Sequence, residues 1–213
     1  QRFLRLLHNL VPARLSLFDE VVDTWHGKTV LDLGCGGGFM AEALAQRGAN
    51  VIGVDPVEAA VVAARAHAGE AGLAIDYRVG SGEAIPLADG SIDCVVCVDV
   101  LEHVADIDRV LDEIVRVLKP DGLFLFDTIN RTLLAAFVIV QLGESVLRLL
   151  PRGTHDPAKF ITPAELSGKL VARGLSVGPF VGLGPCGLNR RLDITFGRFP
   201  SVQIMYAGHA RKG

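Results

Sequence analysis

A strand that runs directly into a glycine-rich turn constrains the fold of this chain more than any other feature. Residues 30–39 read VLDLGCGGGF, and four of the last six positions are glycine. A helical segment follows and ends near Gly48, and a second apolar strand, VIGVD, occupies residues 51–55. Strand, turn, helix and strand in this order begin a βαβ unit, in which the two strands are parallel. The start of the chain therefore predicts a parallel sheet with helices packed against it.

The same alternation continues through residue 128. Further strand-like runs occupy residues 74–79, 91–99 and 123–128, and a helical pattern at 105–122 is closed by Pro120 and Gly122. The terminal run SVQIMYAGHA is also strand-like. We therefore expect an α/β, Rossmann-like, doubly wound and mostly parallel sheet of about seven strands with an antiparallel last strand. One domain should span residues 1–213. Open sheets bind ligands where their parallel strands end, and the glycine turn lies at such an end.

The composition excludes several classes of function. The chain has 213 residues, a net charge of −3 and 6% aromatic residues, and its acidic and basic residues are mixed. No nucleic-acid binding is expected, because neither a basic patch nor interleaved aromatics are visible. Four scattered cysteines do not make a disulfide framework. Cys94 and Cys97 lie three positions apart on a strand and so point to opposite faces. We expect buried thiols in a cytoplasmic protein.

Three kinds of adenosine-containing ligand compete for the glycine turn. A P-loop for ATP requires a lysine after the glycines, and none follows here. A dinucleotide site prefers a third glycine where this chain has Phe39, which weakens that interpretation without excluding it. S-adenosylmethionine has no phosphate; Asp32 could face its cationic groups, and Asp55 could accept from both ribose hydroxyls. An NAD site would use the same acid, so Asp55 alone does not discriminate between them.

The segments after the second strand resemble the class I S-adenosylmethionine-dependent methyltransferases. They read VGSGEAIPLADGSIDCVVCVDVLEHV at 79–104 and LDEIVRVLKPDGLFLFDT at 111–128. The resemblance implies that the loop after the third strand, which carries Gly82 and Glu83, lies beside the adenine of the cofactor. Ser81 stands in this loop where the family usually has aspartate.

The second half of the chain narrows this resemblance to one family of methyltransferases. The run LPRGTHDPAKFITPAEL at 150–166, together with NLVPARL near the start and MYAGHA near the end, is similar to the ubiquinone-biosynthesis O-methyltransferase family. That family methylates a catechol-like hydroxyl on a polyprenylated ring. The resemblance implies that Asp99, Glu102 and His103 hold a metal, with aspartate at 99 in place of the usual glutamate. The carboxylate oxygens at these positions would suit Mg²⁺. The resemblance also implies that Arg14 contacts the cofactor carboxylate, that Gly34 and Asp55 bind the cofactor, and that Val98 lines the adenine pocket. Gly36, in the glycine turn, is expected to bind the cofactor as well.

The chemistry of this cluster can be argued from the residues. A phenol has a pKa near 10, so ionising it at neutral pH costs about 4 kcal/mol. A divalent cation held by carboxylates, or a histidine base, could supply that stabilisation. Glu102 and His103 are the first candidates for this catalytic role. Alternatively, the run LEHV could simply begin a helix in which these two side chains make local hydrogen bonds. His155 with Asp156 is a second candidate base pair, and these two residues could equally brace the loop.

The segment 132–150 is largely apolar and forms the centre of an expected lid or insert at about 130–162. Its uninterrupted apolar run, 133–140, would be only about 12 Å long as a helix, against a hydrocarbon core of roughly 30 Å, so a membrane span is not expected. Polar residues at 141, 144, 145 and 148 follow helical spacing and should share one stripe. The helix either packs on the domain or meets lipid at the inner face of a membrane.

We therefore expect an S-adenosylmethionine-dependent O-methyltransferase that acts on a hydrophobic, hydroxylated aromatic ring. A methyltransferase of the same fold that acts on a soluble specialised metabolite is one alternative. An NAD-dependent oxidoreductase is another, which Phe39 and the later segments disfavour. A small-molecule sensor without catalytic activity is a third.

Overall fold

The computed structural model describes residues 2–146, 153–191 and 193–213. Its strands form one sheet in the order β3-β2-β1-β4-β5-β9-β7-β8, with β6 also paired to β9. The strands β1 to β5 pair in parallel, whereas β9 is antiparallel to β5. The strand bounds are β1 Thr29–Leu33, β2 Asn50–Asp55, β3 Asp76–Val79, β4 Ile92–Cys97, β5 Leu118–Ile129, β6 Leu175–Val177, β7 Val181–Leu188, β8 Ile194–Phe199 and β9 Met205–Lys212.

The predicted α/β fold with a mostly parallel sheet and an antiparallel end is confirmed. The sheet has nine strands in the described residues rather than the expected seven. Two features account for the difference. The short strand β6 and the longer β7 lie one after the other along β9. A hairpin then adds β8 outside β7, through a run that contains Gly184 and Gly187 and lacks the alternation typical of a strand.

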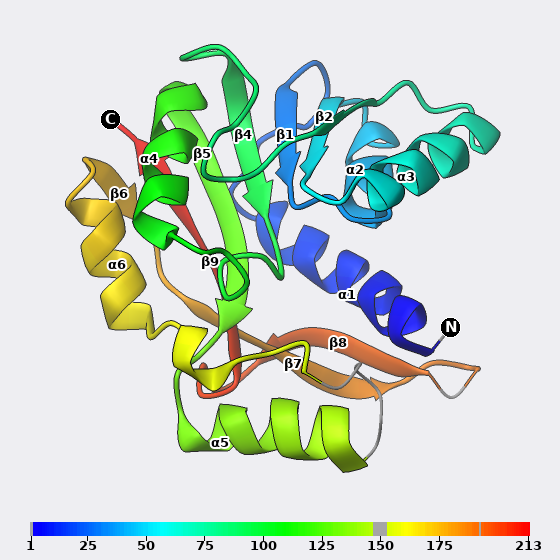
Figure 1. Cartoon of the computed structure of the whole chain (residues 1–213), viewed down its shortest axis with the longest axis vertical. Coiled ribbons are helices and arrows are strands. Elements are labelled where there is room, and N and C mark those ends of the chain that lie inside the picture. The colour runs from blue at the N-terminus through cyan, green and yellow to red at the C-terminus, as the bar shows by residue number, and fades with distance from the viewer. Residues whose placement is uncertain (1, 147–152, 192) are drawn as a thin grey trace.

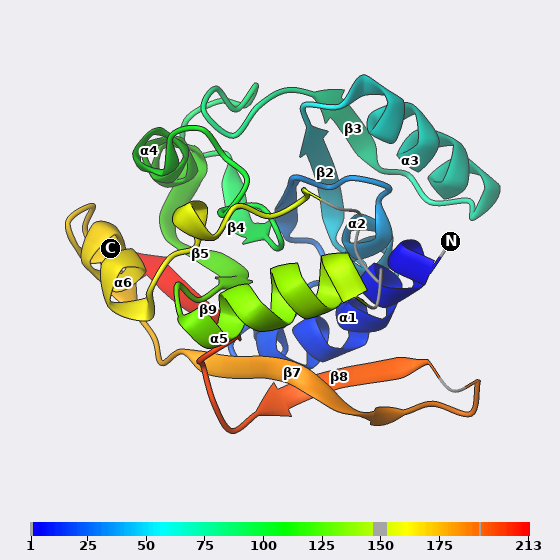
Figure 2. The same cartoon turned by 60° about the horizontal axis from the view of Figure 1, so that its bottom comes forward.

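Helices cover both faces of the sheet (Figures 1 and 2). One layer, α1 to α3, packs on residues such as Val30, Cys94 and Leu125, and the other, α4 and α6, packs on Leu31 and Val95. This alternation along each strand is the two-residue period of a sheet buried on both sides. The helix bounds are α1 Arg2–Phe18, α2 Phe39–Ala45, α3 Glu58–Glu70, α4 Ile107–Val117, α5 Leu133–Ala136, η1 Phe137–Val146, η2 Pro157–Lys159 and α6 Pro163–Val171.

The cysteine interpretation is also confirmed. Cys94 belongs to one apolar layer and Cys97 to the other, and both are buried free thiols. A shared metal or a disulfide between them is therefore ruled out by the direction of their side chains.

The apolar segment forms one turn of α-helix, α5, followed by the π-helix η1. Thr132 caps its start by accepting from the backbone N–H of Ala135. The prediction that the polar residues share one stripe is wrong for Glu144 and Gln141, because Glu144 is buried while Gln141 is exposed. The i→i+5 bonding of a π-helix rotates positions that an α-helix would stack. Position 148 lies outside the described residues.

Candidate active site

A cavity of about 300 Å³ lies at the carboxyl ends of β1 and β4, where α1, the glycine turn and η1 meet. The register explains why the predicted residues reach it. Leu33 lies opposite both Val54 and Cys97, so the three strands end at one edge of the sheet. The predicted site residues that line the cavity are Arg14, Asp32, Gly34, Gly36, Val98, Asp99, His103 and His155.

The glycine turn closes one side of this cavity. The backbone N–H of Gly34 donates to the Val54 carbonyl at 2.7 Å, and Gly38 adopts a φ of +86° as it enters α2. A Cβ at Gly34 would lie 2.2 Å from a methyl group of Val100, and one at Gly38 would lie 2.3 Å from the Tyr77 hydroxyl. Neither position can therefore carry a side chain without displacing its neighbour. The turn exposes backbone to the cavity, where a ligand can approach it closely.

Asp55 holds the turn to the next helix. Its two carboxylate oxygens accept from the backbone N–H groups of Gly36 and Val57, each at 2.9 Å. The side chain is buried and does not line the cavity. Each oxygen has a second lone pair, so the predicted contact with ribose hydroxyls stays a prediction.

Arg14 joins α1 to the sheet through a buried network of charges. Its Nε lies 2.5 Å from Oδ2 of Asp127, and its Nη2 lies 2.5 Å from Oδ2 of Asp99. Burial alone would lower the pKa of Arg14, but the charges of Asp127 and Asp99 outweigh it and raise that pKa. These contacts use Nε and Nη2, which leaves Nη1 as the nitrogen for the predicted contact with a cofactor carboxylate.

Asp127 is a site residue that sequence reasoning missed. It is fully buried on β5, and its Oδ1 accepts from the backbone N–H of Asp99 at 2.9 Å. It thereby fixes Asp99, which has a φ of 54° where β4 ends. The signal was a lone acid near the carboxyl end of the apolar run LFLFDT. A charged residue that interrupts a buried strand is almost always paired.

Asp32 makes the cavity suitable for a cation. Burial raises the pKa of Asp32 to about 7, a hydrogen bond from the Ala41 backbone and the charge of Arg14 oppose the rise, and the charge of Asp55 adds to it. Its Oδ2 has no hydrogen-bond partner among the described residues. With Asp99 and Asp127 nearby, acidic groups outnumber the single arginine in this part of the cavity. A positively charged ligand would offset that imbalance.

Two predicted adenine contacts lie away from this cavity. Gly82 packs against Val110 of α4, to which a Cβ would approach within 3.1 Å. Glu83 accepts from the backbone N–H of Ala105 at 3.1 Å, and its carbonyl accepts from Nε of Arg109. The structure therefore brings together the residues predicted to bind the methionyl part of the cofactor. The loop that carries Gly82 and Glu83 does not line the same cavity. Val98 does line the cavity, and its predicted place beside the adenine stays a prediction.

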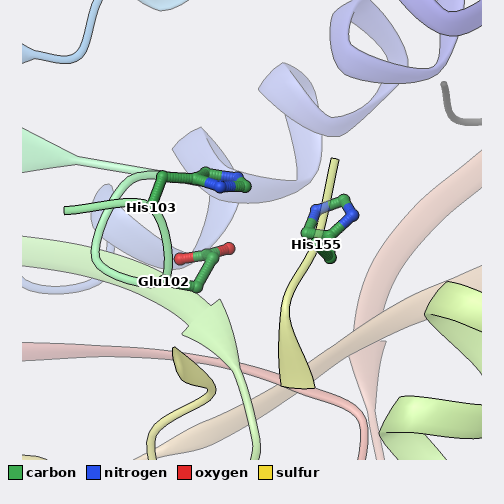
Figure 3. A group of neighbouring side chains, drawn as sticks. All are labelled: Glu102, His103 and His155. Atoms are coloured by element: carbon green, nitrogen blue, oxygen red, sulfur yellow. The ribbon is translucent and has the colours of Figure 1, made fainter. Parts of the chain in front are cut away.

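Glu102, His103 and His155 form a second group, in which one possible ligand atom from each lies within 4.8 Å of the others (Figure 3). Oε2 of Glu102 accepts from the Thr128 hydroxyl at 2.8 Å, and Oε1 has no partner among the described residues. Burial, followed by the charge of Asp99, raises the pKa of Glu102. Burial and the neighbouring His155 lower the pKa of His103. A neutral imidazole can accept a proton from a ligand in this cavity.

This group differs from the expected magnesium cluster. Asp99 does not belong to it, because Arg14 holds the Asp99 carboxylate. His155 takes the third place, which gives two imidazoles and one carboxylate. Magnesium prefers oxygen ligands in an octahedral arrangement, so these residues do not fit it. Imidazole suits transition metals such as zinc, copper or iron better.

His155 is held by Glu144, the second site residue that sequence reasoning missed. Glu144 lies on η1, and its Oε1 contacts Nδ1 of His155 at 2.8 Å and the His155 backbone N–H at 2.9 Å. Burial would raise the pKa of Glu144, but hydrogen bonds from His155 and from the backbone of Gly153 outweigh it and lower that pKa. Asp156, the predicted partner of His155, instead caps the short helix η2. An acid within an apolar helix was the available signal.

Comparison with known proteins agrees with this geometry. The family model described as a methyltransferase domain matches residues 31–126. A ubiquinone biosynthesis O-methyltransferase from Pseudomonas aeruginosa is 45% identical over 178 residues, which cover 83% of this chain and 76% of that protein. A protein of the same name from Pseudomonas fluorescens is 43% identical over 201 residues, which cover 94% and 84% of the two chains.

Solved structures share the fold at low sequence identity. Magnesium protoporphyrin IX methyltransferase from Synechocystis, with bound SAH, has a TM-score of 0.72 at 20% identity and covers 100% of this chain and 87% of that one. A SAM-dependent methyltransferase from Aquifex aeolicus has a TM-score of 0.68 at 19% identity, covering 94% and 89% of the two chains. Taken with the sequence identities, these likenesses show that the chain is an S-adenosylmethionine-dependent methyltransferase and belongs to the ubiquinone biosynthesis O-methyltransferase family.

Proposed function

We propose that this enzyme transfers a methyl group from S-adenosylmethionine to a phenolic or catechol hydroxyl of a hydrophobic, prenylated aromatic compound. The observation that carries the proposal is that one cavity joins the glycine turn, two histidines and an apolar wall. The wall includes Leu10 from α1, Ile139 from η1 and Met205 from β9. An aromatic ring with a hydrocarbon tail is the kind of ligand that such a lining would bury. The names of the relatives support the same substrate class.

The residues divide into two roles. Arg14, Asp32 and the Gly34–Gly38 turn would hold the cofactor, which when bound supplies an electrophilic methyl group on a sulfonium. His103 and His155 line the same cavity, where either can accept the proton of the hydroxyl. Ionising a phenol at neutral pH costs about 4 kcal/mol, which a nearby base offsets. The cavity walls supply the remaining advantage by aligning the acceptor oxygen with the methyl group.

The test is a labelled-methyl assay with S-adenosylmethionine and a panel of catechols that differ in the length of an alkyl chain. We expect methylated product, with KM falling as the chain lengthens. The His103→Ala variant should lower turnover far more than it weakens cofactor binding measured by calorimetry. The same assay with an added chelator shows whether a bound transition metal contributes to turnover. Cofactor binding without methylation of any catechol would overturn the substrate class, and equal use of water-soluble catechols would favour a soluble metabolite.

We further propose that α5 and η1 contact a membrane surface. Leu133 and Phe137 expose 92% and 59% of their surface, whereas Ala135 on the same helix is fully buried. Among the residues that the structure describes, none of the helices has the length and hydrophobicity that crossing a bilayer needs. Ile139 of η1 lines the cavity, and an exposed apolar face on the same segment suits a substrate that resides in lipid.

Co-sedimentation with anionic vesicles tests this contact. The paired change Leu133→Ser and Phe137→Ser should reduce the bound fraction severalfold and leave cofactor binding unchanged. Val62→Ser, at a residue 55% exposed on α3, is the matched control, and it should sediment like the native protein. Equal sedimentation of the paired variant and the control, or no binding by the native protein, would favour a helix that only packs on the domain.

A further inference from the structure

We propose that Glu144 is a positioning residue that fixes the tautomer and the ring orientation of His155, so that Nε2 of His155 presents its lone pair to the cavity. The inference deepens the proposed function, because it gives His155 the part of proton acceptor in the same site. It connects that site to η1, the helix that carries Phe137 of the exposed apolar face.

The contacts of the Glu144 carboxylate carry the inference. Glu144 retains only 2% of its surface exposure and lies on a helix of otherwise largely apolar residues. Its Oε1 contacts both Nδ1 and the backbone N–H of His155, at 2.8 and 2.9 Å. Its Oε2 accepts from the backbone N–H of Gly153 at 2.7 Å. Both oxygens thus face N–H groups of the loop that carries His155, which is how a buried carboxylate is satisfied.

This arrangement determines which nitrogen of His155 is free to react. An ionised carboxylate only accepts hydrogen bonds, so Nδ1 must carry the proton that it shares with Oε1. In a neutral imidazole the other nitrogen, Nε2, then bears the lone pair. The His155 ring lines the cavity, and Figure 3 shows it turned toward Glu102 and His103. The ring centroids of His103 and His155 are 5.1 Å apart.

The location of Glu144 adds a consequence for the whole site. Gly153 and His155 follow η1 in the chain, and the Glu144 side chain links them back to that helix through these three contacts. The packing of η1 against Ile129 and Phe160 therefore sets the position of the base. A ring held in this way keeps its geometry before substrate enters, which reduces the reorganisation that the reaction requires.

The first experiment compares Glu144→Gln with Glu144→Asp and with the matched control Glu70→Gln, at an exposed position of α3. A glutamine has the same shape, but its amide nitrogen must face an N–H donor. We expect kcat to fall about 10–100-fold in Glu144→Gln, the range found when the hydrogen-bond partner that orients a metal-binding histidine is changed. KM and the Kd for S-adenosylmethionine should change less than about threefold, Glu144→Asp should recover part of kcat, and Glu70→Gln should behave like the native enzyme.

The second readout needs no substrate. In protein labelled with ¹⁵N-histidine, imidazole NMR should assign the proton of His155 to Nδ1, and Glu144→Gln should give a mixture of tautomers. Circular dichroism checks that each variant folds, and Glu144→Asp replaces Glu144→Gln if the latter does not. Unchanged kcat and an unchanged tautomer in the folded variant would overturn the inference. If the native protein methylates no catechol and the tautomer still changes, the proposed function fails and the positioning role stands.

Discussion

Asp32 shows at the scale of one residue how the fold prepares for a charged cofactor. It lies at the end of β1, and burial raises its pKa to about 7 while Arg14 opposes the rise. An acid whose folded pKa lies above its unfolded value binds more protons when folded. Its contribution to stability is therefore present at low pH and is lost as the pH rises between the unfolded pKa and about 7. In the absence of ligand, Asp32→Asn should accordingly stabilise the protein at about pH 8.

The same shift predicts how cofactor affinity depends on pH. S-adenosylmethionine is cationic at its sulfonium, so it should bind best when Asp32 is ionised. We expect its Kd to be steady above about pH 7 and to rise below it, by at most about tenfold per pH unit. Calorimetry between about pH 6 and pH 8 measures this dependence. S-adenosylhomocysteine, which lacks the sulfonium charge, should show a smaller change.

Asp32→Asn is the control for this assignment. It should weaken S-adenosylmethionine binding at the higher pH and remove most of the dependence between about pH 6 and pH 8. If the variant kept the slope of the native enzyme, another group would be responsible for the titration.

The sequence located single residues well where strand ends determine their position. Asp32, Gly34 and Val98 could be placed at one edge of the sheet because parallel strands end together. Asp127 and Glu144 could not be paired with their partners in advance. Arg14 and Asp127 are 113 positions apart, and their contact depends on how α1 crosses the sheet. Glu144 reaches His155 from the π-helix η1, whose bonding an apolar run does not signal.

The glycine turn between β1 and α2 gives a prediction at the scale of an element. Gly38 has a φ of +86°, and a Cβ there would lie 2.3 Å from the hydroxyl of Tyr77, which is buried. Gly38→Ala should therefore lower the free energy of unfolding by roughly 2–5 kcal/mol, from backbone strain and from the displaced ring. Urea denaturation measures the loss.

Gly69→Ala is the matched control for this change. Gly69 lies near the end of α3 at negative φ, and a Cβ there would meet nothing within 4 Å. Alanine is the better helix former, so this variant should be more stable than the native protein by about 0.5–1 kcal/mol. If the two alanine variants lost the same stability, the positive φ and the close contact with Tyr77 would not make Gly38 sensitive to substitution.

At the scale of elements, the periodicity of apolar residues predicted the strands and helices of the core, but it did not predict the β7–β8 hairpin or the π-helix η1. The parallel strands and the helices between them follow from apolar patterns that the two layers enforce. The hairpin of β7 and β8 was not expected, because its glycines and cysteine do not alternate with apolar residues. The segment after β5 was expected as one regular helix. It changes to π-helical bonding at Phe137, which an apolar run does not signal.

The cavity belongs to the molecule as a whole, since segments far apart in the chain build its wall. Leu10 on α1, Gly36 in the turn, Val98 after β4, Ile139 on η1 and Met205 on β9 all line it. The helix α1 also packs on α2, β8 and β9. A ligand in this cavity would contact elements from both ends of the chain. Its binding should consequently stabilise the entire domain and not one part of it.

Thermal unfolding tests this expectation. At a free concentration about 100 times its Kd, a ligand that binds only the folded state adds about 2.7 kcal/mol, which for a chain of this size raises Tm by roughly 5–10 °C. S-adenosylmethionine and S-adenosylhomocysteine should both do so, whereas NAD should leave Tm unchanged. Hydrogen exchange should slow in α1 as well as in the glycine turn, because Leu10, Val11 and Arg14 line the same cavity. A rise in Tm with NAD, or protection confined to the turn, would contradict a cavity that the whole fold closes around this cofactor.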